Sequence, residues 1–241
     1  MLLRRVIEHV KVQNWTAVSL DFVIVVIGVF VGIQVSNWNE LRIEREREKT
    51  YIQQLAVEVA QMRAQIGEII EAHDRHLAAM RNTLVALESC DVGAAMLEDI
   101  QHTFTEYQNL QPVQVIDSVY SEMVSSGMLA SLDDDELRRS IWDFYTRLNG
   151  LMGVAAQTRL SLPTVDNIIW EFIQITYTQD GAQALADFRL KDACKERKLK
   201  NAVVEMIDMH ADWRNFLSQM AAPADDILNR LRDLPDIVTP E

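Results

Sequence analysis

Two histidines three positions apart are the residues whose types and spacing most readily suggest chemistry. They belong to the run His73-Asp74-Arg75-His76, and side chains at positions i and i+3 lie on the same face of a helix. Such a pair could hold a metal ion together with a carboxylate from a neighbouring helix. The Glu-x-x-His pattern of helical-bundle metal sites is missing from the sequence, however. We therefore expect no cofactor and favour the alternative that His73 and His76 pack inside a helical core.

A run of acidic residues, Asp133-Asp134-Asp135-Glu136, is the second candidate for ligand binding. It could attract a cation, but acids also favour helix N-termini because of the helix dipole. Asp133 and Glu136 have the spacing of a capping box, so we interpret the run as a helix start. The sequence has no Gly-rich phosphate loop, HExxH, CxxC pair or GxSxG elbow, and we expect that the protein is not an enzyme.

The composition favours long helices and disfavours a nucleic-acid partner. The 241 residues include only 8 Gly and 5 Pro, and aliphatic residues are frequent, so we predict an all-α fold. Lys and Arg number 23 against 36 Asp and Glu, which gives a net charge of −13. Such a charge repels phosphate backbones, and we expect no binding to nucleic acid.

An apolar run near the N-terminus predicts a transmembrane helix over residues 17–37. The stretch from Phe22 to Ile33 is apolar on every side, and its weakly polar shoulders complete the roughly 20 residues that a crossing needs. Trp15 and Trp38 bracket the segment, as aromatic anchors at the two interfaces of a bilayer would. The alternatives are a core helix of a soluble protein and a cleaved signal peptide.

One face of this helix carries small and polar residues. Asp21, Val25, Gly28, Gly32 and Ser36 fall within a narrow arc at 100° per residue, and the two glycines form a GxxxG pair. Close backbone approach at such a pair suits packing against a second membrane helix. GxxxG is also common by chance in apolar segments, so mere composition stays the alternative.

Beyond the membrane segment we predict a helical bundle. Residues 1–16 form a short basic tail, 17–37 the transmembrane helix, 38–90 a long stalk helix that joins the bundle, and 91–241 the remaining helices. These further helices are expected at 96–110, 115–126, 134–160, 163–178, 191–221 and 223–232, with Pro163 and Pro223 at helix starts.

Two of the long helices carry apolar residues at alternating spacings of three and four, which predicts a seam for helix packing. The first seam comprises Ile52, Leu55, Val59, Met62, Ile66, Ile69, Met80 and Leu87. The second comprises Leu199, Val203, Met206, His210, Trp213, Leu217 and Met220. Aromatic residues that recur at helical spacing are also expected in the core, namely Trp142, Tyr145, Trp170, Phe172, Tyr177 and Trp213. If the two seams pack antiparallel, Cys90 and Cys194 meet and either form a disulfide or remain two thiols.

Two stretches resemble the signature of a family of uncharacterised single-pass bacterial membrane proteins. The first stretch runs from Leu20 to Glu40. It shares with the signature an acidic residue, an apolar run that contains VVIG, a Gln and a final NWNE. Here these are Asp21, Val25 to Gly28, Gln34 and Asn37 to Glu40. The second, Ser118 to Tyr145, matches at Ser125, Ser126, Gly127, Glu136, Leu137 and Arg138. Two positions depart from the signature, because Asp21 stands where the family has Glu and Gly32 where Ala is common. The resemblance implies a bacterial, membrane-anchored helical protein and brings no activity with it.

These observations predict a protein of the bacterial inner membrane, with a cytoplasmic N-terminus and a periplasmic helical domain. Basic residues flank the apolar run on both sides in nearly equal number, but a long domain is exported largely regardless of charge. We expect an interaction module, a scaffold or accessory subunit that binds the bilayer and either another membrane protein or itself. The alternatives are a ligand-sensing domain that acts through a partner and a metal-dependent enzyme.

Overall fold

The computed structural model describes residues 15–91, 93–179, 184–187 and 190–233. Its helices and strands are α2 (Trp15–Ser89), α3 (Ala94–Glu106), α4 (Ser118–Ser126), α5 (Met128–Ser131), α6 (Asp135–Phe172), β1 (Gln174–Tyr177), β2 (Ala184–Asp187), α7 (Leu190–Ala193) and α8 (Arg197–Asp233). The fold is essentially all-α, as predicted. The chain divides into two compact units, one up to Thr50 and the other from Tyr51 onward.

The first unit is the N-terminal part of α2, and its apolar side chains are exposed. Among the described residues, one helix is long and apolar enough to cross a membrane, and none of its most apolar stretch is buried within the chain. Phe22 and Phe30, for example, are 69% and 60% exposed. Within the described residues, this stretch therefore has no apolar core around it. Residues 1–14 of the predicted basic tail lie outside the described part of the chain, and its last two residues begin α2.

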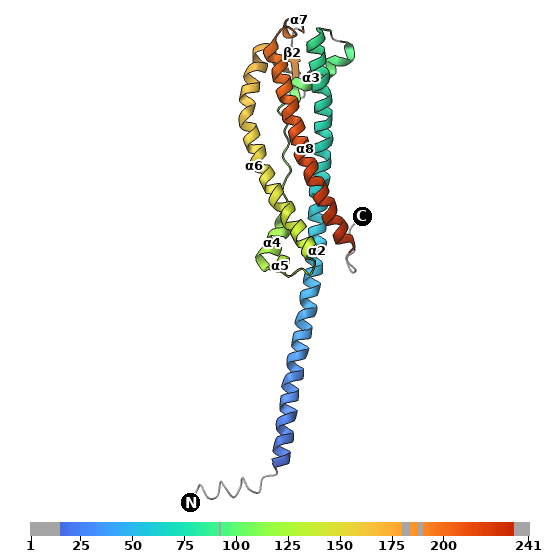
Figure 1. Cartoon of the computed structure of the whole chain (residues 1–241), viewed down its shortest axis with the longest axis vertical. Coiled ribbons are helices and arrows are strands. Elements are labelled where there is room, and N and C mark those ends of the chain that lie inside the picture. The colour runs from blue at the N-terminus through green and yellow to red at the C-terminus, as the bar shows by residue number, and fades with distance from the viewer. Residues whose placement is uncertain (1–14, 92, 180–183, 188–189, 234–241) are drawn as a thin grey trace, which may run out of the picture. The chain divides into compact units, whose positions relative to one another are not determined.

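The second unit is built on α6, α8 and the part of α2 from Tyr51 onward (Figure 1). Helix α8 runs antiparallel to α2, because Asp225 pairs with Arg63 while Cys194 bonds to Cys90 at the other end. It is antiparallel to α6 as well, since Arg230 near its end meets Glu136 at the start of α6. Three long helices thus pack against one another, with α8 antiparallel to both α2 and α6.

All the predicted seam positions on α2 and α8 are buried, but the core that they form has two separate parts. The first cluster includes Leu55 and Met62 of α2 together with Tyr145 of α6. The second includes Met80 of α2 and Val203 of α8, with α3 and the end of α6 packed around them. The 3.6-residue period explains both clusters, because it keeps one stripe of each helix facing its neighbours.

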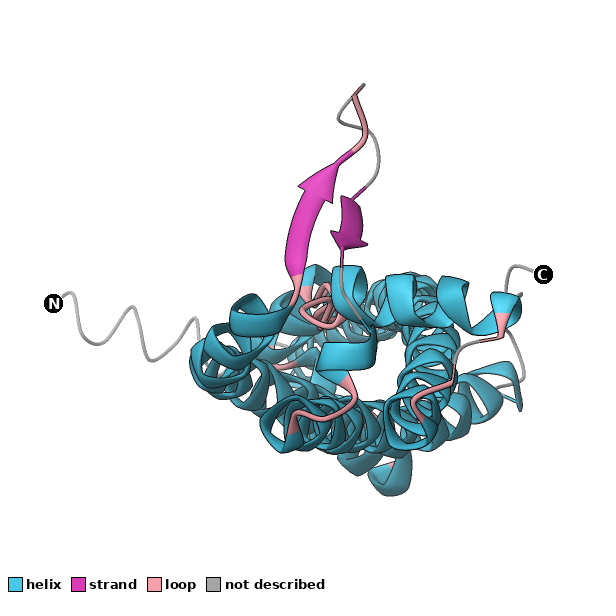
Figure 2. Ribbon diagram, turned by 90° about the horizontal axis from the view of Figure 1, so that it is seen from above, coloured by secondary structure: helices cyan, strands magenta, loops and turns pink. Residues whose placement is uncertain are grey.

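The structure corrects the sequence prediction at both ends of α6. Residues 174–178 were expected to be helical, but α6 ends at Phe172 and β1 pairs antiparallel with β2 in a hairpin that projects from the helices (Figure 2). Ile175 to Tyr177 are β-branched or aromatic, which favours a strand once the helix has ended. The cap of α6 is Asp134 rather than Asp133, since its carboxylate accepts the N–H groups of Glu136 and Leu137.

Neither of the two expected proline starts begins a new helix. Helix α6 runs through position 163, and α8 runs through Pro223 to Asp233. A proline inside a helix removes one backbone hydrogen bond. Here Ala224, Ile227 and Leu231 are fully buried beyond the proline, so their packing continues the helix despite that loss.

Candidate functional site

The corner formed by α4, α5 and α6 contains the second signature segment of the sequence. Gly127 ends α4 and precedes α5 with φ +79°, a left-handed conformation that L side chains rarely adopt. The hydroxyls of Ser125 and Ser126 donate to the carbonyls of Glu122 and Met123 in the last turn of α4. One helix therefore ends at Ser125, Ser126 and Gly127, and the chain turns there into the next helix.

Three further residues of the same segment, Glu136, Leu137 and Arg138, hold the start of α6 in place. Leu137 is buried, and Glu136 pairs with Arg230 of α8 at 2.9 Å. The Arg138 guanidinium donates to the carbonyl of Leu132 at 3.0 Å and to the Asp135 carboxylate at 2.5 Å. These residues thus have structural roles at this corner.

A buried carboxylate that the sequence analysis missed fixes α4 to α2. Glu58 is only 3% exposed and accepts hydrogen bonds from the N–H of Val119 at 2.9 Å and the hydroxyl of Ser118 at 3.1 Å. Its other oxygen accepts the hydroxyl of Tyr145 at 2.6 Å. The negative charge therefore lies at the N-terminus of α4, where the helix dipole stabilises it. Burial, with the hydrogen bond to Glu58, raises the pKa of Tyr145 far above its usual range, so this hydroxyl remains a donor.

An open cleft of about 350 Å³ lies at this corner. Its floor is apolar, and its rim carries two exposed apolar side chains, Val124 at 50% and Trp142 at 55% exposure. Its lining residues are Tyr120, Val124, Leu129, Ala130, Arg138, Arg139 and Trp142. An apolar cleft with an exposed tryptophan is a common site for a partner's side chain.

Two arginines line the cleft. They are Arg138 and Arg139, and Asp135 is the acidic residue that both contact, the first through its carboxylate and the second through its carbonyl at 3.2 Å. Both charged residues among those that line the cleft are thus cationic. The cleft can therefore accept an apolar group that has a negative group beside it.

Three of the aromatics predicted for the core are exposed instead. Trp142, Trp170 and Tyr177 are 55%, 60% and 69% exposed, whereas Tyr145 and Trp213 are buried. On α6 each exposed tryptophan directly follows a buried isoleucine, so it lies about 100° round the helix from the core face. Trp142 is the one that borders the cleft.

The two predicted histidines meet two others that the sequence analysis did not connect with them. His73 Nδ1 lies 2.9 Å from His210 Nδ1 on α8, and His76 Nδ1 lies 2.9 Å from His102 Nε2 on α3. The His210 Nε2 is 3.0 Å from the carbonyl oxygen of Tyr107. Within the described residues, no group of three or more His, Cys, Asp or Glu side chains is placed to hold a metal ion.

Burial keeps three of these imidazoles, His73, His76 and His210, uncharged. Desolvation, followed by the neighbouring imidazoles, lowers the pKa of His73 to about 3 and that of His76 to about 4. Desolvation lowers the pKa of His210 as well. His73, His76 and His210 are therefore neutral at pH 7, and each close pair is a hydrogen bond between one donor and one acceptor nitrogen.

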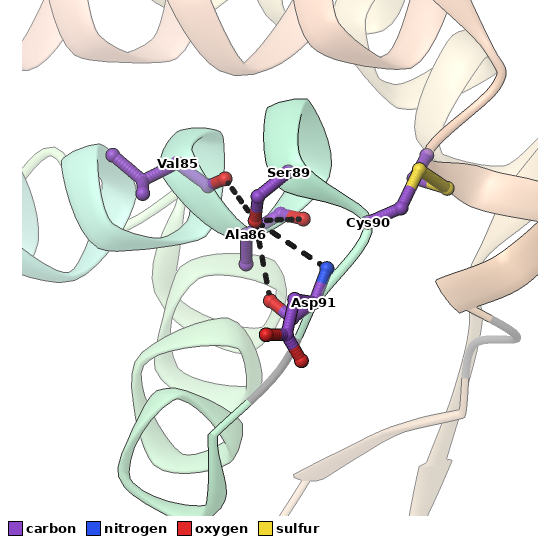
Figure 3. Close-up of a disulfide and its surroundings, with 6 residues drawn as sticks. Val85, Ala86, Ser89, Cys90 and Asp91 are labelled. Atoms are coloured by element: carbon purple, nitrogen blue, oxygen red, sulfur yellow. Dashed lines mark hydrogen bonds between the residues drawn. A yellow bond between two sulfur atoms is a disulfide. The ribbon is translucent and has the colours of Figure 1, made fainter.

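Cys90 and Cys194 are joined by a disulfide, with Cα atoms 5.4 Å apart and a sequence separation of 104 residues (Figure 3). Cys90 follows the last residue of α2 and has φ +55°, a left-handed helix end. The hydroxyl of Ser89 donates to the carbonyl of Val85 at 2.9 Å and accepts the N–H of Asp91 at 3.3 Å. This local network fixes the direction in which the chain leaves the helix.

The residues of the predicted membrane face lie on one helix and are exposed. Asp21, Val25, Gly28, Gly32 and Ser36 all belong to α2, and a Cβ at either glycine would meet no atom within 4 Å. Trp38 is 66% exposed, and the side chain of Trp15 lies outside the described part of the structure. The face is thus present, and its packing partner stays a prediction.

Comparison with known proteins gives a family without an activity. A family model described as a family of unknown function matches residues 21–152, more than half of the chain. No curated protein and no solved structure matches. The matched segment contains every lining residue of the cleft, together with Glu58 and three of the four clustered histidines.

Proposed function

The chain is a member of this family of unknown function, DUF6090, and we propose that it is a membrane-anchored interaction module that binds a protein partner through the cleft at α4–α6. In this role the chain is a scaffold or accessory subunit, and we propose no enzymatic activity for it. The observation that carries it is the cleft itself, where exposed Trp142 and Val124 border an apolar floor. Aromatic side chains at such positions contribute much of the binding energy in protein interfaces.

The geometry of the cleft indicates the chemistry of the partner. A volume of about 350 Å³ accommodates one or two apolar side chains, and Arg138 and Arg139 favour a carboxylate next to them. The expected ligand is therefore a protein segment with an apolar residue beside Asp or Glu. A second copy of the chain qualifies only if it presents such a segment.

The apolar stretch of α2 supports an anchor in the bilayer, because it is long enough to span and none of it is buried. We place the domain on the outer side of a bacterial inner membrane, with the N-terminus in the cytoplasm. The disulfide between Cys90 and Cys194 supports this placement, since such bonds persist in oxidising compartments. Thiol alkylation in intact cells, with and without a reductant, tests it: thiols that react without reduction would place the domain inside.

Site-specific photo-crosslinking in living cells tests the interaction. A photoreactive phenylalanine analogue replaces Trp142 in the full-length chain, and the matched control carries it at Val204, which is 42% exposed on α8 and does not line the cleft. We expect a defined adduct from position 142 and none from position 204. Adducts of the same size from both positions, or none from position 142, would refute the cleft as the binding site.

Two further variants separate specific binding from capture of abundant neighbours. Ala130→Phe places a ring in the cleft, and Arg139→Glu reverses one charge at its edge. Both are expected to remove most of the adduct formed at position 142. Co-production of two differently tagged copies then shows whether the partner is a second copy of the chain. An adduct that both variants leave unchanged would contradict the proposed mode of binding.

The second candidate function is sensing of a small molecule, with the signal passed to a partner. The volume of the cleft supports it, because binding sites for small ligands begin at roughly 300 Å³. A thermal-shift screen on the purified full-length protein should then find a compound that raises the melting temperature of the wild type and not of Ala130→Phe. If every stabilising compound acts on both proteins alike, the sensing role has no support.

A further inference from the structure

The four clustered histidines occupy the gap between the two parts of the core. On α2, His73 and His76 lie between Ile69 of the first cluster and Met80 of the second. On α8, His210 separates Met206 from Trp213 in the same way. The bundle therefore has a polar layer at mid-height, where an apolar seam would otherwise be continuous.

This layer connects three helices by hydrogen bonds that need neutral imidazoles. His210 donates its Nε2 hydrogen to the carbonyl of Tyr107, so its Nδ1 is the acceptor and His73 must donate from its own Nδ1. His76 and His102 form the second pair, which joins α2 to α3. If both rings of a pair were protonated, two N–H groups would face each other at 2.9 Å, and the hydrogen bond would be lost.

The charged groups that the structure describes beside the layer are cationic or already paired. Asp74 on α2 raises the proton affinity of His73, but it is already paired with Arg214 of α8 at 3.0 Å. Arg75 acts against protonation of His76, as do His210 and His102. On α6, the Asp166 carboxylate accepts a hydrogen bond from the hydroxyl of Tyr107 at 2.5 Å. Protonation would thus put buried positive charges beside one another.

We propose that His73, His76, His102 and His210 form a proton-responsive joint that holds the two halves of the bundle together when neutral and releases them when protonated. The half that responds contains α3 and the disulfide, which keeps α2 and α8 tied at their far ends while the joint opens. The half containing Glu58 and the cleft has its own core and its own hydrogen bonds. This inference does not depend on the cleft or its partner.

The direction of the pH dependence follows from the lowered pKa values. An unfolded or locally opened chain binds protons on His73 near pH 6.5, whereas the closed structure does so only near pH 3. Stability from the neutral form is therefore complete above pH 6.5 and is lost as the pH falls towards 3 to 4. At about pH 5, His73 alone favours opening by roughly thirty-fold relative to neutral pH.

Hydrogen–deuterium exchange on the full-length protein in detergent micelles, corrected for intrinsic exchange rates, measures this opening. From about pH 7 to about pH 5 we expect protection of α3 peptides to fall roughly thirty-fold or more, with a much smaller change around Glu58. Isotope-labelled histidine NMR measures the four pKa values in the wild type without any substitution. Protection of the α3 peptides that is the same at both pH values, or four histidine pKa values near 6.5, would overturn the proposal.

Two double variants separate the histidines from the burial of polar groups in general. His73→Leu with His210→Leu replaces one imidazole pair by apolar groups and should abolish the larger part of the pH response. Thr83→Val with Thr103→Val is the control, because these buried hydroxyls form a 2.8 Å hydrogen bond between α2 and α3 but do not titrate. An equal loss of pH response in the control, or a zinc-induced gain in protection at neutral pH that the histidine variant lacks, would refute a proton joint.

Discussion

The Tyr145 hydroxyl donates to the Glu58 carboxylate at 2.6 Å, across 87 residues of sequence and inside the core. The same carboxylate receives the N-terminus of α4, so one charged side chain positions two elements that shape the cleft. Tyr145 also stacks on Tyr120, with ring centroids 4.0 Å apart, and Tyr120 lines the cleft. The shape of the cleft therefore depends on a buried hydrogen bond to α2 rather than on surface loops.

Tyr145→Phe should lower the free energy of unfolding by about 2 kcal/mol, because it removes a buried hydrogen bond to a charged group. Tyr51→Phe is the matched control, since its hydroxyl also donates to a glutamate, Glu122, at 2.6 Å but at the surface. The control should cost less than about 0.5 kcal/mol. Denaturant unfolding of the two variants measures both. Similar losses would show that the buried contact has no special role.

Reduction of the disulfide should destabilise the second unit. The bond closes a loop with a sequence separation of 104 residues, so removing it is expected to cost about 2–5 kcal/mol. Cys90→Ala with Cys194→Ala should reproduce the effect of a reductant on the wild type, and a reductant should not change the stability of that double variant. A reductant that lowers the stability of both proteins equally would point to some other cause.

Gly28→Leu and Gly32→Leu test the packing face of the predicted membrane helix. A Cβ at either position meets nothing within 4 Å, so these substitutions cost the single chain little and any effect reports on a partner helix. Recovery of the partner, or of a second tagged copy, from membranes should fall at least several-fold. Val23→Leu, on the opposite side of the helix, is the control and should have no effect. Unchanged recovery in the glycine variants would assign the GxxxG pair to composition alone.

Much of the fold could be predicted from the sequence because the helices are long and regular. The seams from Ile52 to Leu87 and from Leu199 to Met220 follow one period, and all their members are buried. Antiparallel packing of these seams also brought Cys90 and Cys194 together, which needs only helix length and direction. The hairpin at β1–β2 was missed, because a helical period over 163–178 concealed a short strand at its end.

The cleft and the histidine layer depend on contacts between distant segments, which spacing along one helix cannot predict. Glu58 gave no sequence signal, because a lone glutamate in an amphipathic helix is usually solvated. His102 and His210 lie on two other helices, so only the packing angle of α3 and α8 on α2 brings them to His76 and His73. Trp142 was assigned to the core because its spacing fits a helix, although it faces outward.

The central claim is that the apolar stretch of α2 lies in a bilayer. Alkaline carbonate extraction of membranes from cells that produce the full-length chain tests it most directly. A second chain with Val26→Arg and Phe30→Arg is the control, since each arginine at mid-membrane costs about 3 kcal/mol. We predict that the wild type stays in the membrane pellet and that much of the arginine variant is released. Release of the wild type into the supernatant would contradict the account.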